Sequence, residues 1–244
     1  MAKSKLNDHL LMEFMETFYG FGNYAGKYWL VGMEEAGGQT VEAIQSRLTQ
    51  WQKNGRSELE DLPTHAQQQG WGEKYFGKKP KWQRTWGKLI RLILAAERIR
   101  KVDTAVVKQF QREKLGRYNS NHCLLELLPL PAPSTSHWIY AQYSKLPSLQ
   151  SRKAYRQQLA LTRIAHLRQR LQEHCPQTVI FYGWSYRDWW QQVVERPFTQ
   201  QENPKCLVAV QDGTYFFVIP HPTARGVTNR YFEQVGAQIA TIGG

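Results

Sequence analysis

The sequence predicts an α/β protein of three layers, with helices on both faces of a central, mainly parallel, four-stranded sheet. Short apolar runs at 27–32, 123–128 and 178–183 have the length and composition of buried strands, and patterns of helical period separate them. Near the C-terminus, Gln-Asp-Gly at 211–213 lies between two further apolar runs and indicates a hairpin. Buried strands that alternate with helices favour a parallel sheet between two helical layers.

Each expected element has its own local signal. Apolar residues from Leu10 to Phe18 recur at helical spacing and predict a helix over 7–19. Thr40 is a good N-cap residue and predicts the start of a helix over 40–53. The other expected helices cover 81–99, 103–115, 149–174, 185–195 and 229–241. The strands of the hairpin are expected at 206–210 and 215–219.

Composition restricts the class of protein. The chain has 244 residues, 41% of them hydrophobic and 21% charged, which are globular values that argue against disorder. No apolar run approaches the roughly 18 residues of a membrane span, and the first residues lack the apolar core of a secretion signal. The three cysteines are widely spaced and form no CxxC pair. We expect one cytoplasmic domain over 1–244, without a membrane segment, a metal site or a cofactor.

Positive charge is concentrated in the middle of the chain. The formal net charge is +12, and residues 74–117 alone hold 14 basic and three acidic side chains. Aromatic residues interleave with the basic ones, a pattern that suits a polyanion with stackable bases. We therefore expect a basic, aromatic-rich helical insert at about 55–117 that binds nucleic acid. Its expected phosphate contacts are Lys78, Lys79, Lys81 and Arg84. The alternative is a solvated helix face with a half-buried pair of tryptophans.

Four unusual segments follow the predicted strands, at 32–38, 129–134, 183–186 and 220–226. Ligands of open parallel sheets bind at the carboxyl ends of the strands, so the four segments should meet at one crevice. Glycine and proline in any one of them could reflect ordinary turn chemistry. Convergence of all four favours a functional site.

Two of these segments resemble motifs of the uracil-DNA glycosylase superfamily. Gly-Met-Glu-Glu-Ala-Gly at 32–37 is similar to its Gly-x-(Asp/Asn/Glu)-Pro-Gly loop, and His-Pro-Thr at 221–223 is similar to its His-Pro-Ser. The chain order, the preceding strands and a proline-rich loop after the second strand are also similar. The resemblance covers about 27–38, 119–138, 177–190 and 214–229, and leaves 55–117 unmatched.

The resemblance implies a monofunctional DNA glycosylase, which flips out a base and hydrolyses its N-glycosidic bond to leave an abasic site. Its partner would be DNA, with no cofactor and no protein partner. Glu34 would stabilise positive charge on the sugar and align water, with Glu35 as the second candidate. His221 would hold the negative charge that develops on the departing base.

Base choice would depend on the second strand and the first loop. Glu126 stands where the superfamily has an Asn, and an ionised Glu, which only accepts hydrogen bonds, suits the N4 amino group of cytosine. Beside Met33, the small residues Ala36 and Gly37 would leave room at the 5-position of the base. Together these suggest a 5-modified cytosine, such as phage hydroxymethyl- or glucosyl-cytosine, and an antiviral role. If the alignment slips, Asn121 or its neighbour Asn119 reads the base and uracil becomes the substrate.

The remaining loops would contact DNA. Pro131 and Ser134 would grip the backbone of the kinked strand, and Thr223 and Arg225 belong to the loop that would enter the groove. The proline of the first loop is absent, and Thr223 replaces a Ser. Two other readings therefore stay open: a DNA-binding module of the same fold without chemistry, or a metal enzyme using glutamates.

Overall fold

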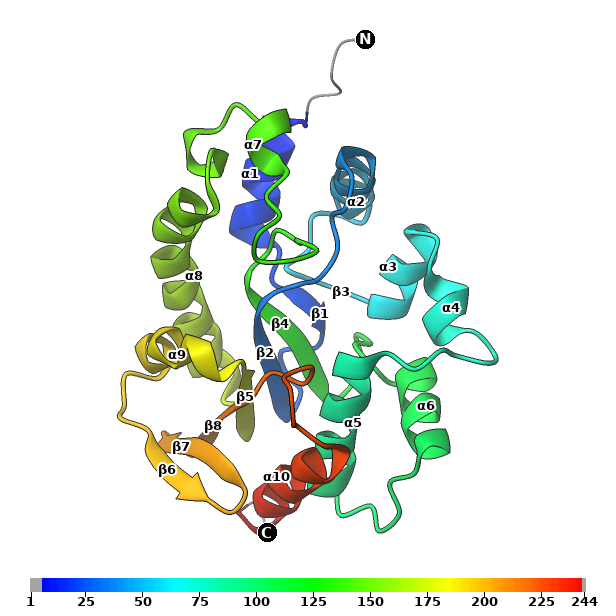
Figure 1. Ribbon diagram of the computed structural model, residues 1–244, viewed down its shortest axis with the longest axis vertical. Helices are drawn as coiled ribbons and strands as arrows, with labels where there is room; N and C mark the ends of the chain where they lie inside the picture. The colour runs from blue at the N-terminus through cyan, green and yellow to red at the C-terminus, as the bar shows by residue number, and fades with distance from the viewer. Residues whose placement is uncertain (1–5, 243–244) are drawn as a thin grey trace.

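The computed structural model describes residues 6–242, and in them one mixed, mostly parallel sheet of eight strands is flanked by ten α-helices (Figure 1). The strands are β1 (Gly20–Gly22), β2 (Tyr28–Glu34), β3 (Leu59–Glu60), β4 (His122–Leu128), β5 (Thr178–Tyr182), β6 (Thr199–Glu202), β7 (Lys205–Gln211) and β8 (Thr214–Ile219). The helices are α1 (Asp8–Thr17), α2 (Val41–Lys53), α3 (Leu62–Gln68), α4 (Gly72–Phe76), α5 (Arg84–Ala96), α6 (Thr104–Glu113), α7 (Tyr140–Tyr143), α8 (Arg152–His174), α9 (Arg187–Val194) and α10 (Asn229–Ile242).

The expected α/β class is confirmed, but the expected count of four strands is wrong. The strand order is β3-β1-β4-β2-β5-β8-β7-β6, and the four central strands β4, β2, β5 and β8 are all parallel. Short strands extend both edges, with β1 and β7 antiparallel to their inner neighbours. Three of the added strands have no apolar run to reveal them, because β1 is Gly-Phe-Gly, β3 has two residues and β6 is polar.

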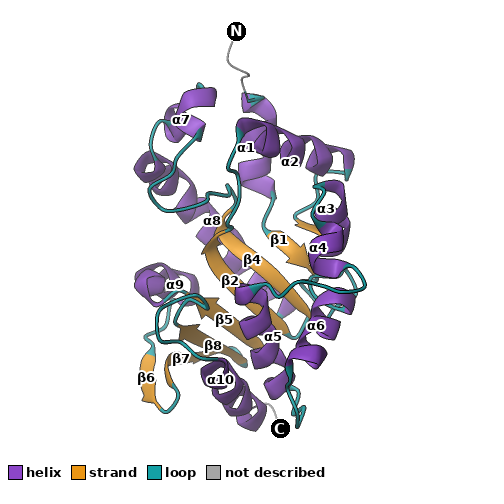
Figure 2. Ribbon diagram, turned by 45° about the vertical axis from the view of Figure 1, so that its right-hand side comes forward, coloured by secondary structure: helices purple, strands orange, loops and turns teal. Residues whose placement is uncertain are grey.

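Opposite faces of the sheet carry different helices (Figure 2). The hydroxyl of Tyr28 donates to Glu97, the residue that ends α5, at 2.6 Å. The next residue, Trp29, lies beside His174 at the end of α8, with ring centroids 6.3 Å apart. Because successive side chains of a strand point to opposite faces, α5 and α8 cover opposite sides. The sheet therefore lies between two helical layers.

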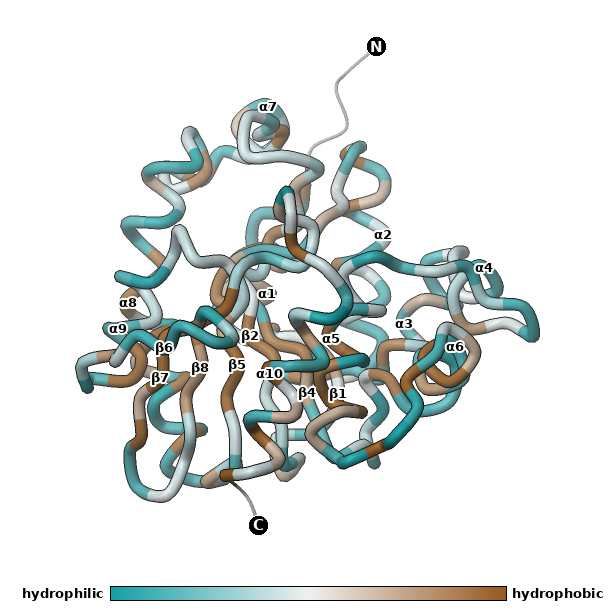
Figure 3. Tube along the Cα trace, turned by 60° about the horizontal axis from the view of Figure 1, so that its bottom comes forward, coloured by the Kyte–Doolittle hydropathy of each residue, from teal (hydrophilic) through white to brown (hydrophobic). Residues whose placement is uncertain are grey.

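The basic segment contributes a central helix of one of these layers. In α5, Leu89, Ile90 and Ile93 are buried in the core, and the apolar colour of the chain in Figure 3 is concentrated on the central strands and this layer. Gly236 of α10 packs so closely on α5 that an added Cβ would lie 2.2 Å from the carbonyl oxygen of Leu92. Residues 55–117 thus form four helices, α3 to α6, and the short strand β3, and α5 is an integral part of the fold.

Capping residues explain where the expected helices shift. Gln83 caps α5 by accepting from the backbone N–H of Trp86 at 2.7 Å, so this helix begins after 81. Ser151 caps α8, and the residues before it form a separate short turn at Pro147–Leu149. The short helices α3, α4 and α7 are not among the expected elements. No helix between residues 6 and 242 is long and apolar enough to cross a membrane.

Candidate functional site

The four segments expected to converge do meet at the carboxyl edge of the parallel strands. The backbone N–H of Ala132 donates to the carbonyl of Glu35 at 3.0 Å, which joins the loops after β2 and β4. Gly38 has a φ of +64° and approaches the carbonyl oxygen of Pro131 so closely that a Cβ would lie 2.7 Å from it. The N–H of Gly183 donates to the carbonyl of Ile219 at 2.9 Å, which joins the ends of β5 and β8.

Gly32 makes room for a pair of polar side chains from the strands on either side of it. Its register partner on β4 is Glu126, and Tyr182 is the last residue of β5. The Tyr182 hydroxyl donates to Oε1 of Glu126 at 2.8 Å. A Cβ on Gly32 would lie 2.4 Å from both the Tyr182 hydroxyl and Oε2 of Glu126. The hydrogen bond therefore crosses β2 in the space that the missing side chain leaves.

Burial changes the protonation of Glu126. Loss of solvent raises the pKa of its carboxyl to about 8, against the opposing effect of the Tyr182 hydrogen bond, and the charges of Glu35 and Glu34 raise it further. Its Oε2 is buried and has no hydrogen-bond partner among residues 6–242. At neutral pH the group is mostly a neutral acid, which both donates and accepts. A carboxyl with this raised pKa differs from the ionised Glu126, an acceptor only, on which the prediction of cytosine reading was based.

His221 is held as a neutral donor. Its Nδ1 accepts from the backbone N–H of Thr223 at 3.2 Å and faces the Thr223 hydroxyl at 2.9 Å. Since Nδ1 accepts, the proton of the neutral ring lies on Nε2. Burial, and then the charge of Lys88, lower the pKa of His221. Its ring centroid is 5.8 Å from that of Tyr182, so it lies beside the Glu126–Tyr182 pair.

Lys88 of α5 fixes the loop that carries His221. Its Nζ donates to the carbonyl oxygens of Pro222 at 2.7 Å and Val227 at 2.6 Å, one near each end of the loop. Burial and the neighbouring charge of Arg84 lower the pKa of Lys88. Sequence reasoning missed this residue, because nothing in a single basic helix shows which lysine faces a loop 134 residues away.

Replacing Lys88 with Met should free this loop. Two charge-assisted hydrogen bonds are lost, and we expect the free energy of unfolding to fall by about 2 kcal/mol in urea titrations. Hydrogen exchange at 223–227 should quicken more than exchange in α5 itself. Lys101→Met is the control, because the Lys101 side chain is 86% exposed and its one ion pair, with Asp103, is long at 3.8 Å. Unchanged exchange in the loop of the Lys88 variant would contradict this positioning role.

Both expected catalytic glutamates are paired with arginines. Glu34 is bound by Arg152 and accepts from Nε and Nη2 of Arg156 at 3.1 and 2.9 Å. Glu35 accepts from buried Arg47 at 2.5 Å. Neither carboxylate is a free base here. Residues 152 and 156 begin a helix more than 110 residues further along the chain, so local sequence reasoning did not find them.

Some of the expected base-recognition residues lie away from the Glu126–Tyr182 pair. Met33 is buried, and its side chain points to the opposite face from Gly32 because neighbours on a strand alternate. Asn121 precedes β4, and its carbonyl accepts from the N–H of Tyr28 at the start of β2. It therefore lies at the opposite end of the sheet from Glu126. Ala36 is exposed and Gly37 half-buried in the first loop, at the carboxyl edge.

Of the loop residues expected to contact DNA, some are exposed at the carboxyl edge and one is buried. Ser134, Thr223 and Arg225 are exposed at the carboxyl edge. Pro131 is buried and its carbonyl accepts from the Tyr140 hydroxyl at 2.9 Å, so its ring is not available to grip a DNA strand.

The basic segment presents charge but few free aromatic rings. Lys78, Lys79, Lys81 and Arg84 are exposed around the loop between α4 and α5. The rings of Trp71, Tyr75, Phe76 and Trp86 instead pack against one another, with centroids 5.6 to 6.3 Å apart. All four side chains are half-buried, and they form a small aromatic cluster beside the exposed basic residues.

Other sites receive no support from the arrangement of side chains. Within the described residues, no three His, Cys, Asp or Glu side chains are grouped so that they could hold a metal ion.

Comparison with models of known protein families and with curated proteins gave no match to this chain. Function must therefore be inferred from the site itself.

Proposed function

We propose that the protein is a DNA glycosylase that flips out a base and hydrolyses its N-glycosidic bond. The observation that carries the proposal is the position of the neutral His221 ring. It lies beside the Glu126–Tyr182 pair, which occupies the space left by Gly32, at the carboxyl edge of the parallel strands. A fixed Nε2–H donor stabilises the negative charge of a departing base, and a carboxyl group nearby reads its polar edge. The resemblance of 32–37 and 221–223 to glycosylase motifs supports the same reading.

The neutral acid of Glu126 changes how the base would be read. Its hydroxyl can donate to N3 of cytosine while its carbonyl oxygen accepts from the N4 amino group. A 5-modified cytosine of phage DNA remains the proposed substrate, and an antiviral role remains part of the proposal. Uracil is the alternative, because the same acid can accept from N3–H and donate to O4.

Glu34 would act together with its two arginines. In the proposed complex, phosphates beside the flipped nucleotide bind Arg152 and Arg156 in competition with the carboxylate. A released oxygen of Glu34 then aligns the attacking water and stabilises positive charge on the sugar. The same change would couple hydrolysis to the presence of DNA.

An abasic-site assay tests the function. Duplexes that carry hydroxymethylcytosine, glucosylated hydroxymethylcytosine, uracil or hypoxanthine are incubated with the protein, and abasic sites are cleaved with alkali. We expect strand cleavage with a modified cytosine and its loss in Glu34→Ala with DNA binding retained. Glu42→Ala, an exposed carboxylate in the first turn of α2, is the control. DNA binding without abasic sites on any substrate would reject catalysis in favour of a binding module.

The protonation of Glu126 gives a pH prediction. If the neutral acid reads the base, cleavage of modified cytosine should fall as pH rises through about 8, where the carboxyl loses its proton. Glu126→Gln should keep most of the activity and lose this alkaline fall, since an amide does not titrate. Rates at saturating enzyme between pH 6.5 and 9.5 measure it. If the rate instead rises through pH 8 and the Gln variant is inactive, the ionised form of Glu126 is the one that recognises the base.

The exposed lysines give a salt prediction. Changing Lys78, Lys79 and Lys81 together to Gln should weaken DNA binding and lower the slope of log affinity against log salt by about 1 for each phosphate that is no longer neutralised. Fluorescence anisotropy across a salt series measures both. Gln at three other exposed lysines, Lys53, Lys145 and Lys205, is the matched control. A changed base preference in the first variant would show that these lysines do more than bind phosphate.

A further inference from the structure

Arg152, the first residue of α8, holds together two parts of the candidate site. Its Nη1 pairs with Glu34, and its Nη2 donates to the carbonyl oxygens of Ser134 and His137, both at 2.8 Å. The Arg152 side chain is 12% exposed and that of Glu34 only 10%, so the ion pair is largely shielded from water. One guanidinium therefore binds the expected catalytic carboxylate and an exposed loop at the same time.

Ser134 and His137 are the two ends of a tight turn in the proline-rich loop after β4. The backbone N–H of His137 donates to the Ser134 carbonyl at 3.2 Å, and all four residues of the turn are exposed. Directly after the turn, the indole of Trp138 is anchored by donating to the Leu149 carbonyl at 2.8 Å. Within residues 6–242, Arg152 is the only side chain outside the turn that forms a hydrogen bond to it. The position of the turn thus depends on Arg152.

The guanidinium of Arg152 has few hydrogens left for a further partner. Both hydrogens of Nη2 are taken by the turn, and Nε is buried with no partner among the described residues. A phosphate binds arginine best through two parallel N–H groups. Because the guanidinium is planar and rigid, Arg152 can offer two such groups only by releasing Glu34, the turn or both. Arg156 differs, since it binds Glu34 through Nε and Nη2 and forms no hydrogen bond to the turn in the part of the chain described.

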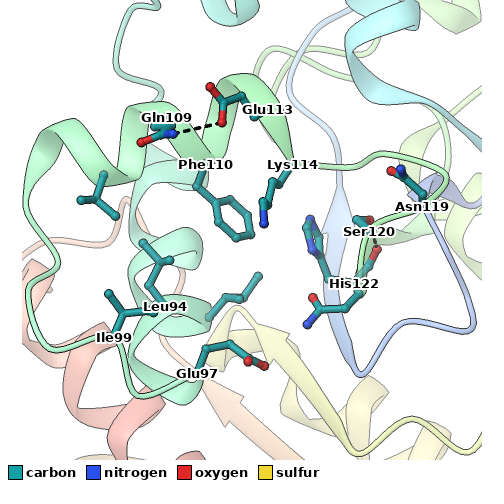
Figure 4. A pocket seen from close by; sticks show the side chains of 13 residues that line it. Leu94, Glu97, Ile99, Gln109, Phe110, Glu113, Lys114, Asn119, Ser120 and His122 are labelled. Atoms are coloured by element: carbon teal, nitrogen blue, oxygen red, sulfur yellow. Dashed lines mark hydrogen bonds between the residues drawn. The ribbon is translucent and has the colours of Figure 1, made fainter.

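This contact lies at the carboxyl edge of the sheet. Glu34 is paired in the sheet with Leu128, the last residue of β4. The cavity between α5 and α6, into which Phe110 extends, lies at the other end of that strand, beside its first residue (Figure 4). Helix α6 is therefore remote from the turn, and it can serve as an internal reference for changes there.

Building on the proposed function, we infer that Arg152 is a latch, which keeps Glu34 paired until DNA engages the turn at 134–137. In the free protein, the turn holds the guanidinium on Glu34. When the DNA backbone meets the turn, a phosphate takes the guanidinium and the carboxylate keeps only Arg156. Binding of DNA and release of Glu34 are then linked, so that each favours the other.

A double-mutant cycle on DNA affinity tests the latch without relying on catalysis. In fluorescence anisotropy with an unmodified duplex, Glu34→Gln should bind about tenfold more tightly than the wild-type protein, because Arg152 no longer leaves a charged partner. In an Arg152→Met background the same change should alter affinity by about twofold at most. Glu42→Gln, at an exposed position on α2, controls for the loss of one negative charge. An equal gain in both backgrounds, or in the control, would overturn the latch.

Hydrogen exchange in the free protein locates the latch. Arg152→Met should speed exchange of the His137 amide, which closes the turn, by about tenfold, whereas Arg156→Met should leave it unchanged. Exchange in α6 verifies that each variant is folded. If Arg152→Met unfolds, Arg152→Lys replaces it, since one ammonium cannot reach the carboxylate and both carbonyls. Equal exchange of the His137 amide in the two arginine variants would overturn the role of Arg152.

The latch and the proposed function can fail separately. Abasic sites formed by a protein that shows neither the affinity gain nor the faster exchange would reject the latch and keep the glycosylase. The affinity gain and faster exchange without abasic sites on any substrate would keep the latch as a regulator of DNA binding and reject the glycosylase.

Discussion

Replacing Arg163 with Met should lower the free energy of unfolding by about 3–5 kcal/mol, the largest loss of stability that we expect from a single substitution in this chain. Arg163 lies on α8 and is completely buried. Its guanidinium donates to the carbonyls of Met15 and Phe18, at 2.9 and 2.8 Å, and to two consecutive carbonyls of β4. The central carbon of its guanidinium, Cζ, also lies 3.5 Å from the centre of the Tyr19 ring.

The size of the effect follows from what the substitution leaves behind. Met fills much of the volume and removes the cost of burying a charge, a cost shown by the lowered pKa of Arg163. It also leaves four carbonyl oxygens without their donor in a place that water does not reach, and each costs about 1–3 kcal/mol. These carbonyls belong to the end of α1 and to β4, so the variant should also loosen the strand that carries Glu126.

Chemical denaturation in urea measures the prediction. Arg168→Met, on the same helix, is the control, because Arg168 is partly exposed and pairs with Glu195 on the surface. Surface pairs contribute about 1 kcal/mol or less, so its midpoint should move little. Arg163→Lys should be nearly as damaging as the Met variant, since a single ammonium cannot reach all four carbonyls. Equal midpoints for the two Met variants would refute the assigned role.

The sequence predicted the central strands because their signal is local. β2, β4, β5 and β8 are short apolar runs, and the turn at Asp212 and Gly213 has the positive φ values that its Asp-Gly sequence favours. The edge strands carry no such run. β1 is visible only through its pairing with β4, which is a property of the folded sheet rather than of its three residues.

The candidate site was predicted in part for the same reason. Placing a loop at a carboxyl edge needs only strand order, so the convergence of the four segments could be expected. Pairing Glu34 with arginines of α8, or Glu126 with Tyr182, requires the register between distant segments. One local signal was overlooked: Gly32 within a buried strand marks a close approach of neighbouring groups.

In the basic segment at 74–117, composition alone does not distinguish buried basic residues from exposed ones. Its net charge was correctly read from the sequence, but a helix such as α5 can be both basic and part of the core. Arg91 is buried, and it donates to the carbonyl of Val102 at 2.5 Å and to Glu233 of α10 at 2.6 Å. A count of charges does not separate such residues from the exposed Lys78 and Lys79. Only the exposed ones can give the salt dependence expected for DNA binding.

His221→Ala should reduce base excision about 100- to 1000-fold, the effect of removing one preorganised donor from a developing anion. Single-turnover rates with enzyme in excess measure the chemical step directly, and DNA affinity should change little, because the donor acts on charge that forms only as the bond breaks. His9→Ala, at a solvated position on α1, is the control.

The acid side of the rate profile distinguishes a neutral donor from a charged one. Burial and Lys88 lower the pKa of His221, so the ring stays neutral down to a pH below the ordinary histidine value of about 6.5. Protonation would place a hydrogen on Nδ1, which then could no longer accept from the Thr223 N–H. The rate should therefore stay level from pH 7 to about 6.5 and fall only below it. A rate that rises as His221 gains its proton would instead make the imidazolium the active form and contradict the fixed tautomer.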